Sequence, residues 1–231
     1  MEQLIDQNTY FSHDNPYHEK LKSFDNFVLR DEEGEAFRGN WSKNAFKNQG
    51  PLVLEIGSGY GHFMMDFCSH YPEINFVGMD YKFKRSFQLA QKLEKLERKN
   101  FFFLRANGAR VDRLFSESEL DQVFYFFPDP WPKNKHKKKR LFQKNFLKQV
   151  HSVLKPQGKF FIKTDHSDYA EWMKALLLEC PFFKIETVSF DIRQEYPEHF
   201  LSSFQTKFEK IFLKQDIPIK GFELTCLKEG P

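Results

Sequence analysis

Cysteine is scarce in this chain, and its three cysteines are far apart. Cys68, Cys180 and Cys226 form no CxxC pair. An odd number of distant cysteines fits neither a disulfide framework nor a zinc ribbon. The pattern indicates a reducing, cytoplasmic compartment, and we expect no metal site.

Long apolar runs are also lacking. No uncharged apolar stretch approaches the roughly 20 residues that a membrane-spanning helix needs. Residues 1–9 carry acids and amides in place of an apolar core, which argues against a secretory signal peptide. We therefore expect no membrane partner.

The chain does have a core-forming composition. Of its 231 residues, 40% are hydrophobic and 29% are charged, which excludes a disordered or collagen-like protein. The net charge is only +3. The length fits one large domain. Residues 1–46 are polar and weakly periodic, so we predict an N-terminal arm followed by a single domain that spans residues 47–231.

Apolar runs alternate with amphipathic stretches from residue 51 onward. The expected strands are 52–56, 74–80, 101–105, 122–127, 158–164, 182–188 and 219–227. The expected helices are 62–70, 82–97, 141–154 and 167–178. This alternation predicts an α/β fold with a mostly parallel, seven-stranded sheet and helices on both faces. The last strand is expected to be antiparallel, either at the edge of the sheet or inside it.

A glycine-rich loop with the sequence EIGSGYG, residues 55–61, follows the first expected strand. Gly57, Gly59 and Gly61 allow a tight turn and a close approach of the backbone to a ligand. A dinucleotide-binding fingerprint would need glycine at position 62, where this chain has histidine, so a nicotinamide cofactor is disfavoured. The loop instead resembles motif I of the class I S-adenosylmethionine methyltransferases.

Three polar residues extend this cofactor hypothesis. Glu55 suits the cationic sulfonium and amino groups of S-adenosylmethionine. Asp80 stands at the end of the second expected strand, 21 residues after Gly59, where it can accept hydrogen bonds from ribose hydroxyls. Asn107 follows the third expected strand, where such enzymes often hold an Asp or Asn that contacts adenine. The alternative is a structural turn in a different α/β protein.

A proline-rich motif, FPDPWPK at residues 127–133, follows the fourth expected strand. Asp129 lies between two prolines, which fix φ on either side of it. Open α/β sheets bind ligands beyond the carboxyl ends of their strands. Asp129 is therefore a candidate for a rigidly held catalytic carboxylate. A loop that caps a helix is the alternative.

Six of the eight residues from 133 to 140, the basic run, are Lys or Arg. Because the whole chain carries only +3, this positive charge is concentrated beside the expected site, as in proteins that bind a phosphate backbone. A solvated charged face is the alternative. The residues expected to contact phosphate are Lys135, His136, Lys137, Lys138, Lys139 and Arg140.

Taken together, these motifs resemble the bacterial tRNA (guanine-N7-)-methyltransferases. The resemblance covers about residues 50–225 and depends on the proline motif, the basic run, KTD at 163–165 followed by Tyr169, and TKFE at 206–209. It implies a Rossmann-like class I methyltransferase fold. It also implies methyl transfer from S-adenosylmethionine to N7 of a guanine in the tRNA variable loop, forming 7-methylguanosine.

The resemblance also implies a role for individual residues. Its cofactor residues correspond to Glu55, Asp80, Asn107 and Asp129. Its substrate residues correspond to Lys133, Asp165, Thr206, Lys207, Phe208 and Glu209. Many members have Glu in place of Asp80 and Asp in place of Asn107. An Arg-Pro pair often precedes the TKFE block, where this chain has Ser203 and Phe204.

Guanine N7 presents a lone pair without a proton, so the proposed reaction needs no general base. Asp129 is expected to orient the substrate and to stabilise the positive charge that moves onto the purine. Asp165 or Glu209 would accept hydrogen bonds from guanine N1–H and the N2 amino group. The sequence leaves open which of the two does so.

Three rival functions are considered. A non-catalytic RNA-binding protein would not need the loop at 55–61. A methyltransferase that acts on nucleic-acid adenine or on protein glutamine would carry an Asn-Pro-Pro-Tyr-like motif in place of Pro-Asp-Pro-Trp. A small-molecule methyltransferase would not need the basic run. Monomer and homodimer both stay open.

Overall fold

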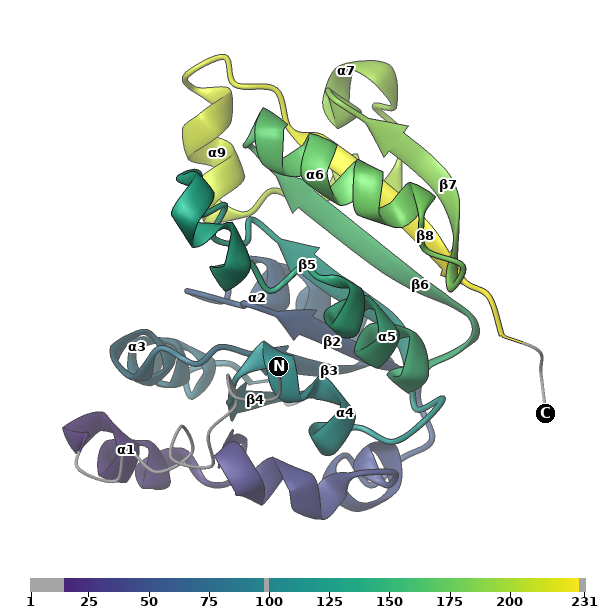
Figure 1. The fold of residues 1–231 in the computed structure, drawn as a ribbon. Helices are drawn as coiled ribbons and strands as arrows, with labels where there is room; N and C mark the ends of the chain where they lie inside the picture. Colours follow the sequence, from purple (N-terminus) through teal and green to yellow (C-terminus); the bar gives the residue numbers. More distant parts are fainter. Residues whose placement is uncertain (1–14, 98–99, 229–231) are drawn as a thin grey trace. The chain divides into compact units, whose positions relative to one another are not determined.

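The computed structural model describes residues 15–97 and 100–228 (Figure 1). The chain forms two compact units, residues 1–116 and residues 117–231. Within the described ranges, no helix combines the length and the apolar character needed to cross a membrane. The same residues contain no cluster of three or more His, Cys, Asp or Glu side chains suited to a metal ion.

The first unit contains four parallel strands in the order β1-β4-β3-β2. Their bounds are Val28–Arg30 (β1), Leu52–Ile56 (β2), Asn75–Met79 (β3) and Phe101–Arg105 (β4). Strands β2 and β3 are buried along their whole length, which explains their continuous apolar sequences. Strand β1 was not predicted, because three residues give too short a pattern.

Short helical segments surround these strands. The helices are α1 (Pro16–Leu21), α2 (His62–His70), α3 (Phe83–Leu93) and α4 (Val111–Leu114). The 3-10 and π segments are η2 (Lys22–Phe24), η3 (Asp31–Phe37), η4 (Trp41–Ala45) and η5 (Gly108–Arg110).

Residues assigned by the sequence to an N-terminal arm pack into the first unit. The Trp41 ring is buried against Phe115, with centroids 5.3 Å apart, and its indole N–H donates to the Leu114 carbonyl at 2.9 Å. The buried Asp31 carboxylate lies 2.8 Å from Nη2 of Arg105 on β4. These contacts give the segment a defined place in the unit, and the domain division at residue 46 stays a prediction.

The second unit contains four strands in the order β5-β6-β8-β7. Their bounds are Leu120–Phe126 (β5), Leu154–Thr164 (β6), Phe183–Ser189 (β7) and Lys220–Cys226 (β8). Strands β5 and β6 are parallel, and β8 is antiparallel to both of its neighbours. The last strand therefore lies inside the sheet, between β6 and β7. The described residues therefore contain eight strands, four in each unit, whereas seven were predicted.

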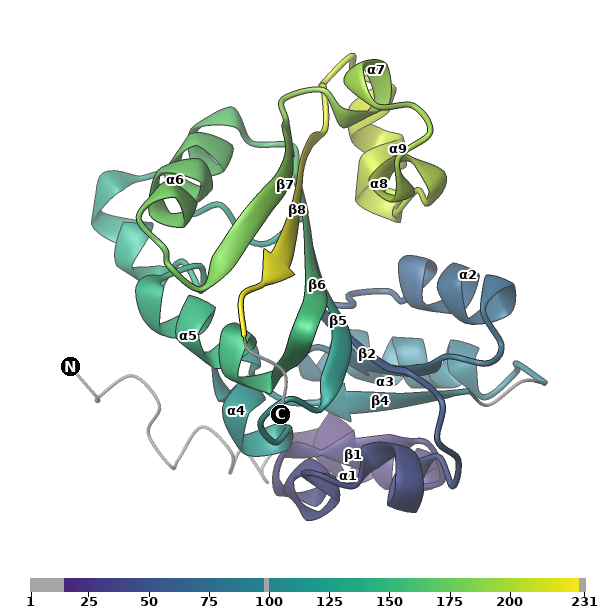
Figure 2. The ribbon, with the colours of Figure 1, turned by 90° about the vertical axis from the view of Figure 1, so that its right-hand side faces the viewer.

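Helices lie on both sides of the strands in the second unit (Figure 2). On one side are α5 (Lys144–Val153) and α6 (Ser167–Leu178). On the other are α8 (Phe200–Ser203) and α9 (Lys207–Leu213), and α7 (Ile192–Glu195) follows β7. The basic run contains a 3-10 segment, η6 (Asn134–Lys139). Helix α5 begins three residues later than predicted.

Candidate functional site

The glycine loop of the first unit has the backbone conformation that its sequence predicts. The φ angles of Gly57, Gly59 and Gly61 are +91°, +58° and +70°. Residues with a Cβ atom rarely adopt such angles. The N–H groups of Gly57 and Ser58 both donate to the Met79 carbonyl, at 2.8 and 2.9 Å. The loop is therefore fixed on the end of β3.

Asp80, directly after β3, also holds this loop. Its Oδ2 accepts from the Gly59 N–H at 3.0 Å, and its Oδ1 accepts from the Lys82 N–H at 2.8 Å. Nη1 of Arg85 lies 3.5 Å from Oδ2. A carboxylate offers about four lone-pair positions. Asp80 can therefore keep both backbone contacts and still accept hydrogen bonds from a ligand.

Glu55 is a buried acid near the end of β2. Its Oε2 has no hydrogen-bond partner among the residues that the structure describes. Burial raises the pKa of Glu55 to about 8; a hydrogen bond from Ser58 opposes this shift, and the charge of Asp80 adds to it. Buried carboxyl oxygens are nearly always paired in proteins. The orphaned oxygen therefore fits the cationic group of a ligand.

Two further side chains in the first unit bear on a ligand. The Asn107 Oδ1 accepts from the Ala109 N–H at 3.0 Å and so caps η5. This leaves the amide nitrogen of Asn107 to act as a donor. Tyr81 is exposed immediately after Asp80 and offers an aromatic surface there. Tyr81 belongs to no sequence motif, and its place directly after β3 is the only sequence signal that points to it.

In the second unit, Asp129 is exposed on a tightly held loop. The flanking residues Phe127 and Trp131 have φ angles of +51° and +42°. The Phe127 N–H donates to the backbone carbonyl of Lys163 at 2.8 Å. A loop that keeps such strained residues is fixed by its surroundings. The structure thus places Asp129 on a rigid support, as the prolines predicted.

The basic run presents cations and aromatic rings together. Lys133, Lys135, Lys138 and Lys139 are exposed, and His136 and Lys137 are half-buried. The Lys139 ammonium lies 4.9 Å from the centre of the Trp131 ring, and the Lys137 ammonium lies 5.8 Å from that of Trp172. Cation–π contacts of this kind orient long, flexible side chains. This part of the run is available to a polyanion.

Arg140 differs from the rest of the basic run because it is only 3% exposed. Its Nε donates to the Pro130 carbonyl at 2.7 Å. Its guanidinium carbon lies 4.6 Å from the ring centre of Tyr169 and 5.1 Å from that of Trp172. Arg140 therefore holds the loop that carries Asp129. Its contact with phosphate stays a prediction.

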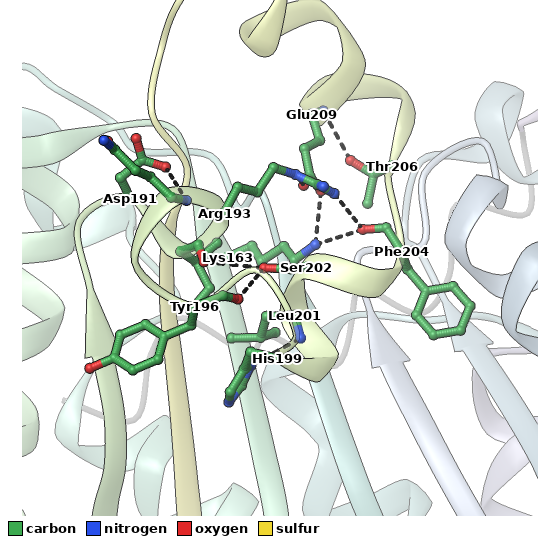
Figure 3. Close-up of polar contacts among 12 residues, drawn as sticks. Lys163, Asp191, Arg193, Tyr196, His199, Leu201, Ser202, Phe204, Thr206 and Glu209 are labelled. Carbon is green, nitrogen blue, oxygen red and sulfur yellow. Dashed lines mark hydrogen bonds and ion pairs between the residues drawn. The ribbon is translucent and has the colours of Figure 1, made fainter.

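Thr206 and Glu209 of the TKFE block take part in a network of polar contacts (Figure 3). The fully buried Glu209 carboxylate lies 2.9 Å from the Lys163 ammonium and 2.7 Å from Nε of Arg193. Lys163 also donates to the Phe204 carbonyl at 2.8 Å. Thr206 Oγ1 accepts from the Glu209 N–H at 3.1 Å and caps α9. Burial lowers the pKa of Lys163 to about 8, and the Glu209 carboxylate opposes that shift.

The other predicted substrate residues lie nearer the surface. Lys207 and Phe208 are exposed, and Asp165 is half-buried just after β6. The Asp165 backbone carbonyl accepts from the Lys220 ammonium at 2.9 Å. In the described part of the chain, the Asp165 carboxylate makes no hydrogen bond. Of the two acids predicted to recognise guanine, Asp165 has free acceptors, whereas Glu209 is occupied by two cations.

Comparisons with known proteins identify the family of the chain. Residues 49–221 match a family model described as a putative methyltransferase. The chain is 31% identical to the tRNA (guanine-N(7)-)-methyltransferase of Oceanobacillus iheyensis, over 87% of this chain and 91% of the relative. It is 33% identical to the enzyme of the same name from Oenococcus oeni, over 83% of this chain and 88% of the relative.

A solved structure shows a similar fold. The 16S rRNA methyltransferase KamB matches with a TM-score of 0.59 at 16% identity, over 87% of this chain and 95% of that one. The α/β arrangement is thus the class I methyltransferase fold. The glycine loop of residues 55–61 therefore occupies a methyltransferase scaffold, as the sequence predicted.

Proposed function

Because the chain belongs to the tRNA (guanine-N(7)-)-methyltransferase family, we propose that it transfers the methyl group of S-adenosylmethionine to N7 of a guanine in the tRNA variable loop. The product is 7-methylguanosine. The Asp129 loop carries the proposal: a rigidly held, exposed carboxylate is followed directly by a run of cations that includes four exposed lysines.

The residues of the first unit suit S-adenosylmethionine. The unpartnered Oε2 of Glu55 accepts a hydrogen bond from the cationic amino group. Asp80 accepts from the ribose hydroxyls, and the Asn107 amide nitrogen donates to adenine. Gly57, Gly59 and Gly61 let the backbone approach the ligand closely. When bound, the cofactor supplies an electrophilic methyl group on a sulfonium.

In the second unit, Asp129 acts as an electrostatic partner of the reacting guanine. The N7 lone pair needs no deprotonation, so Asp129 removes no proton. It stabilises the positive charge that develops on the purine, and its fixed loop keeps it oriented for this. Asp165 accepts from guanine N1–H and the N2 amino group, which excludes adenine. The exposed lysines of the basic run bind the tRNA phosphates.

The reaction is tested by incubating the full chain with tRNA and S-adenosylmethionine and analysing the nucleosides by mass spectrometry. We expect 7-methylguanosine. N2-methylguanosine or a methylated adenosine as the main product would contradict the proposal. A chain that binds tRNA but yields no methylated nucleoside would be a non-catalytic RNA-binding protein.

Asp129→Asn tests the electrostatic role separately, because it keeps the shape of the side chain and removes its charge. We expect the methylation rate to fall by about 10²–10³-fold, the scale seen when one preorganised group is lost. The pH profile should gain no base-dependent limb. Glu171→Gln, which neutralises an exposed acid on α6, is the control and should keep wild-type activity. A fully active Asp129→Asn protein would reduce Asp129 to a structural role.

A further inference from the structure

Asp31 in the first unit combines a buried charge with a strained backbone. It is 2% exposed, and its φ angle of +46° lies in the left-handed region that few residues other than glycine adopt. Each feature lowers stability unless the surroundings compensate for it. Asp31 directly follows β1, which pairs in parallel with β4 (Figure 2). The residue therefore lies at the edge of the sheet where β4 ends.

The Asp31 carboxylate faces the turn that follows β4. It lies 2.8 Å from Nη2 of Arg105, the last residue of that strand. Burial raises the pKa of Asp31 to about 7, and the positive charges of Arg105 and Arg110 oppose this shift. In the sequence these two arginines stand on either side of Asn107, whose side chain caps η5. One carboxylate thus attracts both ends of the turn that carries Asn107.

Arg105 also connects this turn with the start of α3. Its guanidinium carbon lies 3.8 Å from the ring centre of Phe83, the first residue of that helix. The Asp80 N–H, just before α3, donates to the Leu104 carbonyl at 3.2 Å. Through Arg105, Asp31 therefore supports both the residues proposed to accept from the ribose and the turn proposed to donate to adenine.

The segment that follows Asp31, residues 32–41, packs on the continuation of the same turn. The Arg38 Nε–H donates to the backbone carbonyls of Asp112 and Phe115, at 3.2 and 3.3 Å. The buried Trp41 ring stacks on that of Phe115. This part of the N-terminal segment is thus built against the stretch of chain that begins with Asn107.

We propose that Asp31 is a positioning residue of the cofactor site: by holding Arg105, it fixes the turn on which Asn107 meets adenine. Asp31 itself does not touch the cofactor. It keeps the Asn107 amide nitrogen oriented for a hydrogen bond, and this preorganisation lowers the cost of binding. The inference relies on the proposed function, since it takes Asn107 as the adenine contact.

Asp31→Asn tests the charge, because asparagine also tolerates a positive φ and keeps an oxygen that can accept from Arg105. We expect the affinity for S-adenosylmethionine, measured by calorimetry, to fall roughly 3- to 10-fold, the scale of one lost hydrogen bond. Affinity for tRNA should not change. Glu32→Gln, which neutralises the exposed acid next to Asp31, is the matched control and should keep wild-type affinity.

A double-mutant cycle distinguishes positioning from a general loss of structure. Asn107→Ser keeps an oxygen that can cap η5 and removes the amide nitrogen. If Asp31 acts through Asn107, Asp31→Asn/Asn107→Ser should bind the cofactor no more weakly than Asn107→Ser alone. Losses that multiply would show independent action and overturn the proposal. Wild-type affinity in Asn107→Ser would remove the adenine contact itself, and this inference with it.

Asp31→Gly separates the side chain from the backbone, because glycine adopts a positive φ without strain. We expect it to bind S-adenosylmethionine at least as weakly as Asp31→Asn does. Wild-type cofactor affinity in both variants, even with a lower midpoint of urea unfolding, would reduce Asp31 to a structural role and overturn the proposal. These are cofactor-binding measurements, so their failure is distinct from a failure of the wild-type chain to form 7-methylguanosine.

Discussion

The two units build their candidate sites by different means. In the first, backbone N–H groups of the loop at 57–61 bond to Met79 and Asp80, and glycine supplies the conformation. In the second, buried side chains far apart in sequence hold the exposed segments: Lys163 meets Glu209 across 46 residues. A site made by the backbone leaves a glycine pattern in the sequence, while a site held by distant side chains leaves none.

Removal of the Glu209 carboxylate should lower the free energy of unfolding more than any other change considered. Glu209→Ala leaves the buried Lys163 ammonium without a carboxylate partner, and breaking a buried ion pair from one side costs about 3–5 kcal/mol. We expect the free energy of unfolding, measured with urea, to fall by that amount. Glu171→Ala, which truncates an exposed acid, should change it little. A loss below about 1 kcal/mol for Glu209→Ala would show that the network does not hold the second unit together.

This contrast also explains what the sequence could predict. The loop at 55–61 and Asp80 were recognised because a turn that needs glycine and an acid at a strand end are local patterns. All of the described strands except β1 were recognised for a similar reason, since they are short apolar runs in the sequence. Asp129 was found through its prolines, although Arg140 and the backbone carbonyl of Lys163 also hold its loop.

Other features could not be predicted because they depend on long-range contacts. Strand β1 has only three residues and is defined by its pairing with β4. Glu209 was one of two acids predicted to recognise guanine, and only the fold reveals the two cations that its carboxylate contacts. Arg140 has the sequence context of a surface cation, yet it packs on Tyr169. Residue type alone does not say whether a charge faces water or a partner.

A single added methyl group should destabilise the glycine loop of the first unit. A Cβ on Gly61 would lie 2.2 Å from Cδ1 of the buried Leu89, whereas a Cβ on Gly57 would meet nothing within 4 Å. Both glycines have positive φ, so Gly57→Ala should cost about 1–2 kcal/mol of unfolding free energy. Gly61→Ala should cost about 1–3 kcal/mol more, because it also overpacks the core. Equal losses in urea unfolding would contradict this account of the loop.

Glu55 should make cofactor binding in the first unit depend on pH. Its pKa of about 8 keeps it protonated at neutral pH, whereas a cationic ligand group favours the ionised form. Binding of S-adenosylmethionine should therefore release close to one proton at pH 7, and the affinity should rise by up to about tenfold per pH unit below pH 8. Calorimetry in buffers of different ionisation enthalpy counts the proton. Glu55→Gln should bind more weakly and release none; proton-free binding by the wild type at pH 7 would exclude this role.

The basic run contains lysines that face solvent and an arginine that packs inward, so the two situations can be compared within one segment. Lys137→Ala/Lys138→Ala/Lys139→Ala removes cations that face solvent wholly or in part, and each lost phosphate contact should lower the salt slope of tRNA binding by roughly 0.7–0.9. Arg140→Lys keeps the charge but cannot reproduce the Nε contact to Pro130 or the packing on Tyr169. It should keep the wild-type slope while the methylation rate falls, since the Asp129 loop loses its support. If Arg140→Lys instead flattens the slope as the triple variant does, Arg140 contacts phosphate in the complex and its inward position does not persist there.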